Sequence, residues 1–596
     1  MRNIKLLVAI TLVLTLVLAT AIGCATTTVQ PEDTEEHGEV EAIEETEETK
    51  AHVEAVVSSH HLATEAGIEI LAAGGTAADA AVTVAAVMSV VEPFYSSALG
   101  GGTWAVYHDA DTGDVTSLDG VGPVGSKATV EDYSARGGRA GMHQSVVPGA
   151  WDGWMLWLEE YGVLDLDVVL APAIRIAREG FPISTELANW MNFDSRYISG
   201  RPDTARIYMP EGKMLKKGDT IYQHDMADTF EALADEYNSK LNQGRSEAIQ
   251  AARDYYYRGP LAEAIVDFSD KNDGYLTLED FNGFEAEIVD SISIQYNDQL
   301  EVFQSPPNSQ GITMLIALNI LKGYDFSQYG PDDAEAVHLQ VEAIKLAFAD
   351  MYYYIGDPRR VDIPIDQLLS DEHAENQRER IVMDTALKWP IADGLAANNP
   401  ASTNTTAFHV VDKHGNAAAV TTSIGAQFMV IGDTGIHINN RMRMICTEDG
   451  NPNQLAPGYK VRHTSNPYLA FKNGELYIVG ANTGADNQPQ GQVQQFIAIA
   501  EFGIDAQEAV SRPRFFSTAH PSLTFPYQVE NKLYVHHGYP EAIINKLKTL
   551  GHDVQVGGVY GSAHVIVIED SGLNARTGAE PRNDASLGIV NPAETQ

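Results

Sequence analysis

The stretch TNTTAFHVVDKHGNAAAVTTS, residues 403–423, decides the fold and the chemistry that we expect of this chain. Its two apolar halves predict two β-strands. The polar residues DKHGN (412–416) between them predict a turn in which Gly415 takes a positive φ. If the hairpin is symmetric about His414, Thr405 lies opposite Ser423, and cross-strand neighbours are close enough to touch. The sequence therefore predicts two hydroxyl groups in contact. A threonine hydroxyl can act as a nucleophile when an amine beside it takes its proton.

Composition indicates a large, acidic, globular protein. The chain has 596 residues, of which 44% are hydrophobic, and a formal net charge of −43. This length allows two to four domains, although large α/β layers can form one unit. The negative charge favours high solubility and argues against non-specific binding to nucleic acid.

The N-terminus predicts export and a lipid anchor. A basic start and a short apolar run are followed by small residues and Cys24, the arrangement of a bacterial lipoprotein signal peptide over 1–24. The alternative is ordinary signal cleavage and a freely secreted protein. Residues 25–51 are rich in Asp and Glu and predict a disordered, acidic tether. The other cysteine, Cys446, then has no partner, so no disulfide framework is expected.

Several elements of the globular part can be placed by periodicity and turn residues. They are two helices over 63–88 that meet at Gly74-Gly75, a strand over 103–108, a helix over 170–178 that ends at Gly180, and a long helix over 335–354.

No metal or cofactor is expected. Residues 269–280 faintly suggest a calcium loop, but with Gly274 at the sixth position the first and third ligands would be Ser269 and Lys271, which fails the required charge pattern. The 18 histidines include no HExxH pair.

Ten segments, in order along the chain, resemble the γ-glutamyltranspeptidase family of N-terminal-nucleophile hydrolases. They are GGTAADAAV (74–82), LGGGTWAVY (99–107), VVPGAWDGW (146–154), LAPAIRIAREGF (170–181), DYYYRGPLAEAI (254–265), SPPNSQGI (305–312), AFADMYYYIGDP (347–358), the opening stretch, GIHINNRM (435–442) and GAEPRNDASLG (578–588). The segments 451–467 and 484–492 are similar to the cephalosporin-acylase-like branch, in which the lid over the substrate is short or missing.

The resemblance implies an α+β fold, a four-layer αββα sandwich, and one autocatalytic cleavage of the chain. Carried over by motif, the cut lies between Asn404 and Thr405 and leaves a large subunit, 52–404, and a small subunit, 405–596. The chemistry supports this independently. If the Thr405 hydroxyl attacks the Asn404 carbonyl, the freed α-amine, with a pKa of about 8, can serve as the base that the nucleophile needs.

The resemblance also implies partners for the nucleophile. Ser423 stands where the family has a threonine that hydrogen-bonds the nucleophile. The family's Gly-Gly turn, whose two N–H groups hold the oxyanion, corresponds to Gly484-Ala485, and each such donor contributes roughly 3–4 kcal/mol to the transition state.

The substrate pocket departs from the family pattern. The large-subunit arginine that holds the substrate α-carboxylate is missing from segment 119–123, and the paired serines correspond to His463-Thr464. The ligands of the α-amine correspond to Gly425, Arg441 and Met444, so no acceptor remains there for an ammonium. Arg441, Arg443 and Arg462 could instead bind an acid placed differently, and His463 and Thr464 remain candidate substrate-binding residues. The alternative is that Arg441 is a solvated surface charge.

Two main functions and a weaker third remain open at this level. The first is a self-cleaving γ-glutamyltransferase-like amidohydrolase of glutathione metabolism, made as a zymogen, hydrolysing more than it transfers, and acting on a small-molecule or peptide amide at the bacterial cell envelope. The second is a catalytically silent surface binding protein of the same fold. The third is an acylase on a non-glutamyl amide. For the active enzyme, the two subunits come from one precursor, and contact with the membrane is expected only through the lipid.

Overall fold

The computed structural model describes residues 51–136, 138, 140–388, 404–425, 427–522, 527–558 and 561–591. The signal peptide, Cys24, the tether up to residue 50 and the loop before Asn404 lie outside these ranges. Residues 50–596 form one compact unit, which is described here. Within the described ranges, no helix combines the length and apolar character needed to cross a membrane.

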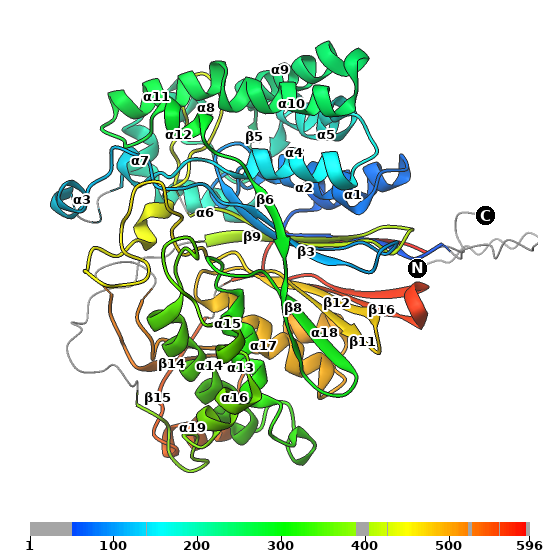
Figure 1. Cartoon of the computed structure of the whole chain (residues 1–596), viewed down its shortest axis with the longest axis vertical. Coiled ribbons are helices and arrows are strands. Elements are labelled where there is room, and N and C mark those ends of the chain that lie inside the picture. The colour runs from blue at the N-terminus through cyan, green and yellow to red at the C-terminus, as the bar shows by residue number, and fades with distance from the viewer. Residues whose placement is uncertain are drawn as a thin grey trace, which may run out of the picture. The chain divides into compact units, whose positions relative to one another are not determined.

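Two antiparallel β-sheets lie face to face between two layers of helices (Figure 1). The first sheet has the order β18 (Ser586–Val590), β1 (Glu54–Ser58), β9 (Asn404–Val411), β10 (Ala417–Gly425), β2 (Gly102–His108), β3 (Val115–Gly120) and β6 (Glu287–Asp290). The second has the order β17 (Asn574–Gly578), β16 (Ala563–Glu569), β12 (Glu475–Asn482), β11 (Tyr468–Lys472), β8 (Leu300–Gln304) and β7 (Ile292–Gln295). The predicted α+β, αββα architecture is confirmed.

The first sheet is covered by helices from the first half of the chain (Figure 1). These are α1 (His61–Ala72), α2 (Ala77–Val91), α3 (Val130–Arg136), α4 (Ala150–Tyr161), α5 (Leu166–Glu179), α6 (Thr185–Phe193), α7 (Ser195–Ser199), α8 (Pro202–Tyr208), α9 (His224–Lys240), α10 (Arg245–Tyr257), α11 (Pro260–Lys271) and α12 (Leu278–Asn282), with the short ribbon β4 (Phe181–Pro182) and β5 (Thr220–Ile221).

The second sheet is covered on its outer side by α13 (Gly311–Leu321), α14 (Ala334–Tyr354), α15 (Ile365–Leu368), α16 (Asp371–Arg378), α17 (Asn487–Ala500), α18 (Ala506–Ser511) and α19 (Glu541–Thr549). A small sheet of β13 (Phe515–Ser517), β14 (Lys532–His536) and β15 (Asp553–Gly557) accompanies them.

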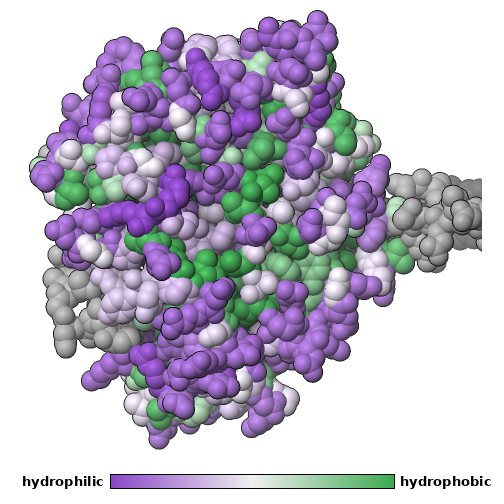
Figure 2. Space-filling view, in the orientation of Figure 1, coloured by the Kyte–Doolittle hydropathy of each residue, from purple (hydrophilic) through white to green (hydrophobic). Residues whose placement is uncertain are grey.

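Three apolar cores separate the four layers. Successive side chains of a strand point to opposite faces, and β1 shows the result: Val56 packs into the core under the first helical layer, whereas Val57 packs into the core between the sheets. The third core, under the second helical layer, includes Val302 and Phe348. Burying one such side chain contributes about 1.5–3 kcal/mol, so both faces of these strands must be apolar. The outer surface is largely hydrophilic on the face seen in Figure 2, as the net charge of −43 leads one to expect.

The hairpin of β9 and β10 lies in the middle of the first sheet and has the predicted register. Thr422 pairs with Thr406 and Ala417 with Val411, symmetric about His414, and the register shifts by one only after Thr422. Gly415 has φ +90°, as predicted.

The predicted helices are confirmed, with small changes in length. The helical stretch 63–88 divides into α1 and α2 around Gly74, which has φ +91°. The long helix over 335–354 is α14, and the helix predicted over 170–178 begins earlier, at Leu166.

Candidate active site

Thr405 lies at the start of β9 and is 1% exposed. Its Oγ1 lies 3.4 Å from Ser423 Oγ, across the hairpin, so the predicted approach of two hydroxyl groups is confirmed. The Gln488 amide, from the first turn of α17, lies 2.9 Å from the same Oγ1. The Thr405 hydroxyl is therefore held between the two sheets, by one contact from β10 and one from the helix that follows β12.

Gln488 is a neighbour to which the sequence assigned no role. When its amide oxygen faces Thr405, its nitrogen donates to Thr464 O and Asn466 Oδ1, both at 2.8 Å. In this orientation the Gln488 amide oxygen accepts a hydrogen bond from the Thr405 hydroxyl. The sequence offered one signal for this role, which was the position of Gln488 in the segment 484–492. Gln488 comes one helical turn after Gly484-Ala485, on the side of the helix that faces β9.

Ser423 is a hydrogen-bond acceptor as well as a neighbour of Thr405. Its Oγ accepts from the backbone N–H of Gly425 at 3.0 Å and from Arg441 Nη1 at 2.9 Å. These two donors fix the hydroxyl in place. A donor that is charged makes the stronger kind of hydrogen bond.

Arg441 is 1% exposed, so the alternative of a solvated surface charge is wrong. Its Nη2 donates to Thr464 Oγ1 at 3.1 Å, which places both predicted residues beside Ser423. Arg441 makes no ion pair within the described residues. Burial, and then the neighbouring Arg462, lowers the pKa of Arg441 to about 9, so the guanidinium still carries its charge at neutral pH.

His463 offers a further donor. Its Nδ1 accepts from the backbone N–H of Ser465 at 3.2 Å, which leaves the imidazole proton on Nε2. Nε2 is buried and has no partner among the described residues. Burial, together with Arg441, holds the pKa of His463 well below its usual value, so the ring is neutral. A Cβ placed on Gly102, which pairs with Ser423, would lie 3.3 Å from this nitrogen.

The predicted oxyanion turn has two consecutive positive φ angles, +104° at Gly484 and +56° at Ala485. Neither N–H donates to an acceptor in the described part of the chain. The turn comes directly before α17, whose N-terminus carries the positive end of the helix dipole. Two free N–H groups there form a ready site for an oxyanion.

Thr406, next to Thr405, begins a buried polar chain that the sequence did not reveal. Its Oγ1 lies 2.6 Å from Glu92 Oε2 and 3.3 Å from Ser59 Oγ, and Ser59 lies 3.0 Å from His564 Nε2. Burial, and then Glu186, raises the pKa of Glu92 well above its usual value. The chain fixes the start of β9 from the side opposite Ser423.

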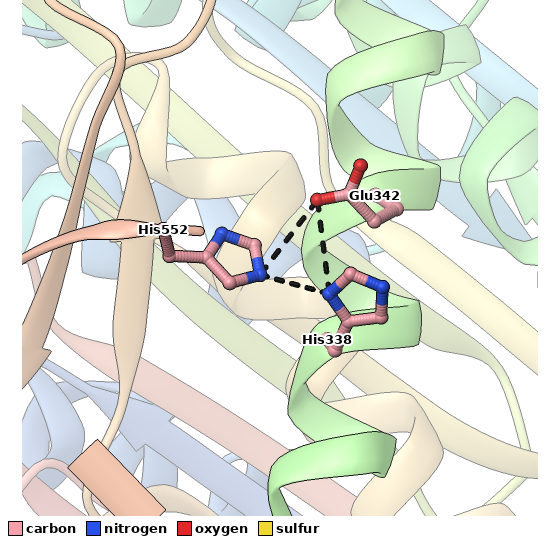
Figure 3. A group of neighbouring side chains, drawn as sticks. All are labelled: His338, Glu342 and His552. Carbon is pink, nitrogen blue, oxygen red and sulfur yellow. Dashed lines mark hydrogen bonds and ion pairs between the residues drawn. The ribbon is translucent and has the colours of Figure 1, made fainter. Parts of the chain in front are cut away.

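A separate cluster in the second helical layer resembles a metal site. His338 and Glu342 on α14 face His552, which precedes β15 (Figure 3). The rings of His338 and His552 are hydrogen-bonded at 2.8 Å, but Lys345 Nζ already lies 2.7 Å from Glu342 Oε1. Because the lysine charge occupies the place next to the carboxylate, the residues fit a hydrogen-bonded network better than a metal ion.

The model of the γ-glutamyltranspeptidase family matches residues 63–589. The chain belongs to this family. It is 33% identical over 545 residues to the glutathione hydrolase-like YwrD proenzyme of Bacillus subtilis, a match that covers 90% of this chain and 98% of the relative.

Two further relatives share most of the chain. The oxamate amidohydrolase proenzyme of Klebsiella pneumoniae is 30% identical over 548 residues, with 89% and 97% of the two chains covered. The crystal structure of cephalosporin acylase from Bacillus halodurans superposes with a TM-score of 0.79 at 30% identity, with 90% and 96% covered. This member of the γ-glutamyltranspeptidase family is accordingly an enzyme of the hydrolase and acylase type.

Proposed function

We propose that the chain is an amidohydrolase that cuts itself between Asn404 and Thr405 and then uses Thr405 as an N-terminal nucleophile. The observation that carries the proposal is the buried Thr405 hydroxyl, held at the start of β9 by Ser423 and Gln488. The proenzyme names of the relatives agree with one precursor that yields two subunits, here 52–404 and 405–596.

Maturation follows from the position of the hydroxyl. Thr405 Oγ attacks the carbonyl carbon of Asn404, the C–N bond breaks as an ester forms, and the α-nitrogen takes up the proton. Water then hydrolyses the ester, which leaves a carboxylate on Asn404 and a free amine on Thr405. An α-amine has a pKa of about 8, so about a tenth of it is the free base at pH 7, and the fraction rises above that pH.

Turnover uses the same atoms. The α-amine takes the hydroxyl proton as Thr405 Oγ attacks the substrate amide, and the N–H groups of Gly484 and Ala485 stabilise the negative oxygen of the tetrahedral intermediate. The amine of the substrate leaves with the proton that the α-amine had taken, and water then hydrolyses the acyl-enzyme. One residue supplies both nucleophile and base, so no cofactor or metal is needed.

The acyl group is expected to meet Arg441, His463 and Thr464. Relatives named glutathione hydrolase-like, acylase and oxamate amidohydrolase differ in substrate but share an amide that is cut. We expect hydrolysis to exceed transfer, because the resemblance to the branch with a short or missing lid implies few contacts for an acceptor amine. The missing arginine in segment 119–123 and the charge on Arg441 favour a non-glutamyl amide over a γ-glutamyl one.

A denaturing gel of the purified protein tests the core of the proposal. The wild type should give two fragments, and N-terminal sequencing of the smaller should read Thr-Thr-Ala-Phe. Thr405→Ala should stay whole and hydrolyse no amide, whereas Thr405→Ser should still cut itself. An uncut wild type after long incubation would favour the silent binding protein, and turnover by Thr405→Ala would place the nucleophile elsewhere.

We further propose that the enzyme is exported to the bacterial cell envelope and anchored through lipidated Cys24, with 25–51 as the tether. Radiolabelled palmitate should be incorporated into the wild type and not into Cys24→Ala. Label in the variant, or none in the wild type, would leave a freely secreted enzyme.

A further inference from the structure

Two buried arginines, Arg441 beside Ser423 and its neighbour Arg462, have no negative partner among the described residues. Arg441 and Arg462 are 1% and 3% exposed, and neither forms an ion pair within the described residues. They are close enough for Arg462 to act on the charge of Arg441. Burying an uncompensated charge is costly, and two like charges together cost more. An anion that enters this site would offset that cost.

The free donors of the site point to the same kind of ligand. Arg441 Nε, His463 Nε2 and two nitrogens of Arg462 are buried without a hydrogen-bond partner among the described residues. Of the unpartnered acceptors in the segments next to these donors, Gln310 Oε1 belongs to a neutral amide, and Asp486 Oδ1 belongs to a carboxylate that forms no ion pair with either arginine among the described residues. The arginine-rich side of the site is therefore built for a carboxylate.

The distance from Arg441 to the nucleophile limits which carboxylate can bind. Arg441 Nη1 lies 2.9 Å from Ser423 Oγ, and Thr405 Oγ1 lies 3.4 Å from that same oxygen. Laid end to end, the two contacts place the guanidinium nitrogen at most about 6 Å from the nucleophile. A carboxylate held by Arg441 thus lies next to the reacting carbonyl.

This inference rests on the proposed function. We propose that the substrate is the monoamide of a short dicarboxylic acid, in which the free carboxylate is bonded directly to the scissile carbonyl or is one carbon away from it. Arg441 binds the carboxylate, and His463 Nε2 donates to it.

The size of the acid follows from ordinary bond lengths. Attack occurs at about 3 Å, across the carbonyl plane, and a charge-assisted hydrogen bond spans about 2.8 Å. With these contacts, a carboxylate directly on the carbonyl requires about 6 Å between guanidinium and nucleophile, one methylene requires about 7 Å, and three extended methylenes require about 9 Å. Within the limit of about 6 Å, a carboxylate directly on the carbonyl fits in an extended form, one methylene fits with a slight bend of the acyl chain, and three methylenes fit only when the chain is folded. A γ-glutamyl group has three carbons between its α-carboxylate and the scissile carbonyl, so it does not fit Arg441 in an extended form.

Hydrolysis of a graded series tests the chain length. The cleaved enzyme is assayed for amine release from the monoamides of oxalic, malonic, succinic and glutaric acid, with acetamide as the uncharged reference. The kcat/KM should be at least tenfold higher for the oxalic or malonic monoamide than for the glutaric one. Arg441→Gln should lose at least 100-fold on the short acids and less than tenfold on acetamide, a difference that a purely structural defect would not produce. The control Arg443→Gln, on the same 3-10 turn but without a contact to Ser423 or Thr464, should keep the wild-type ranking.

Binding of free anions separates this inference from the proposed function. By calorimetry on the protein as isolated, oxalate or malonate should bind at least tenfold more tightly than glutarate, and Arg441→Gln should abolish the difference. If the anions bind in this order but no amide is hydrolysed, the enzyme proposal is wrong and the carboxylate site stands. If amides are hydrolysed but the glutaric monoamide is preferred, or Arg441→Gln binds oxalate as the wild type does, the carboxylate site is wrong.

Discussion

Removal of the Ser423 hydroxyl should slow self-cleavage, because that oxygen links Arg441 to the nucleophile. In Ser423→Ala, Arg441 Nη1 loses an acceptor at 2.9 Å and Thr405 loses a neighbour at 3.4 Å. A hydrogen bond to a charged group is worth about 1.5–3 kcal/mol. If all of this energy serves to hold Thr405 in place, the rate falls roughly 10- to 150-fold, since 1.36 kcal/mol is a factor of ten.

The assay is the appearance of the small fragment on a denaturing gel after pulse-labelling of the precursor, which requires no knowledge of the substrate. The matched control is Thr421→Val, two residues earlier on β10. The Thr421 hydroxyl is buried but has no partner among the described residues, so its loss should change the rate less than threefold. Cleavage of Ser423→Ala at the wild-type rate would refute the positioning role. An equal slowing of both variants would show only that β10 tolerates no change.

Three other outcomes are expected. Burial raises the pKa of Glu92, so protonated Glu92 stabilises the fold below the usual pKa of 4.5, and this stabilisation is lost as pH rises through the folded-state pKa. By calorimetry, the melting temperature of Glu92→Gln minus that of the wild type should therefore increase from pH 5 to pH 8. A constant difference would contradict this. Ala485 has φ +56°, which costs about 1 kcal/mol for a residue with a Cβ; Ala485→Gly should recover part of this in thermal unfolding and keep activity, and a loss of activity would mean that the methyl group has a role. EDTA should leave the melting temperature unchanged, because Lys345 already neutralises Glu342; a drop restored by zinc would show that an ion binds there.

The fold could be predicted well because its signals are local. The turn at Gly415 needs a positive φ, and the alternation on either side then determines the whole register of the hairpin up to Thr422. Helix α14 was found from its apolar spacing and its end near Gly356. The two-sided burial of β1 could not be told from sequence, because a short apolar run suits a buried strand and a buried helix equally.

The site was less predictable, because its contacts join distant parts of the chain. Gln488 is 83 residues from Thr405, and Glu92 is 314 residues from Thr406. A glutamine near the start of a helix and a glutamate after a helix are ordinary in sequence, and only the stacking of the sheets brings them to β9. The burial of Arg441 was likewise undecided, since an arginine in a loop is usually exposed.

The charge of Arg441 also explains why loss of the large-subunit arginine need not mean loss of activity. A site needs one cation for a substrate carboxylate, and we propose that Arg441 supplies it, about 6 Å or less from Thr405 Oγ1. The same charge would repel the α-ammonium of a γ-glutamyl group, and burial strengthens that repulsion because the local dielectric is low. A cation at Arg441, in place of the missing arginine, therefore favours a different substrate. The γ-glutamyl group carries two charges far from its amide, whereas the substrate expected here carries a single negative charge close to its amide. The Thr405 hydroxyl, its proposed free amine and the proposed oxyanion turn need no change for this exchange, because in the proposed mechanism they act on the amide bond alone.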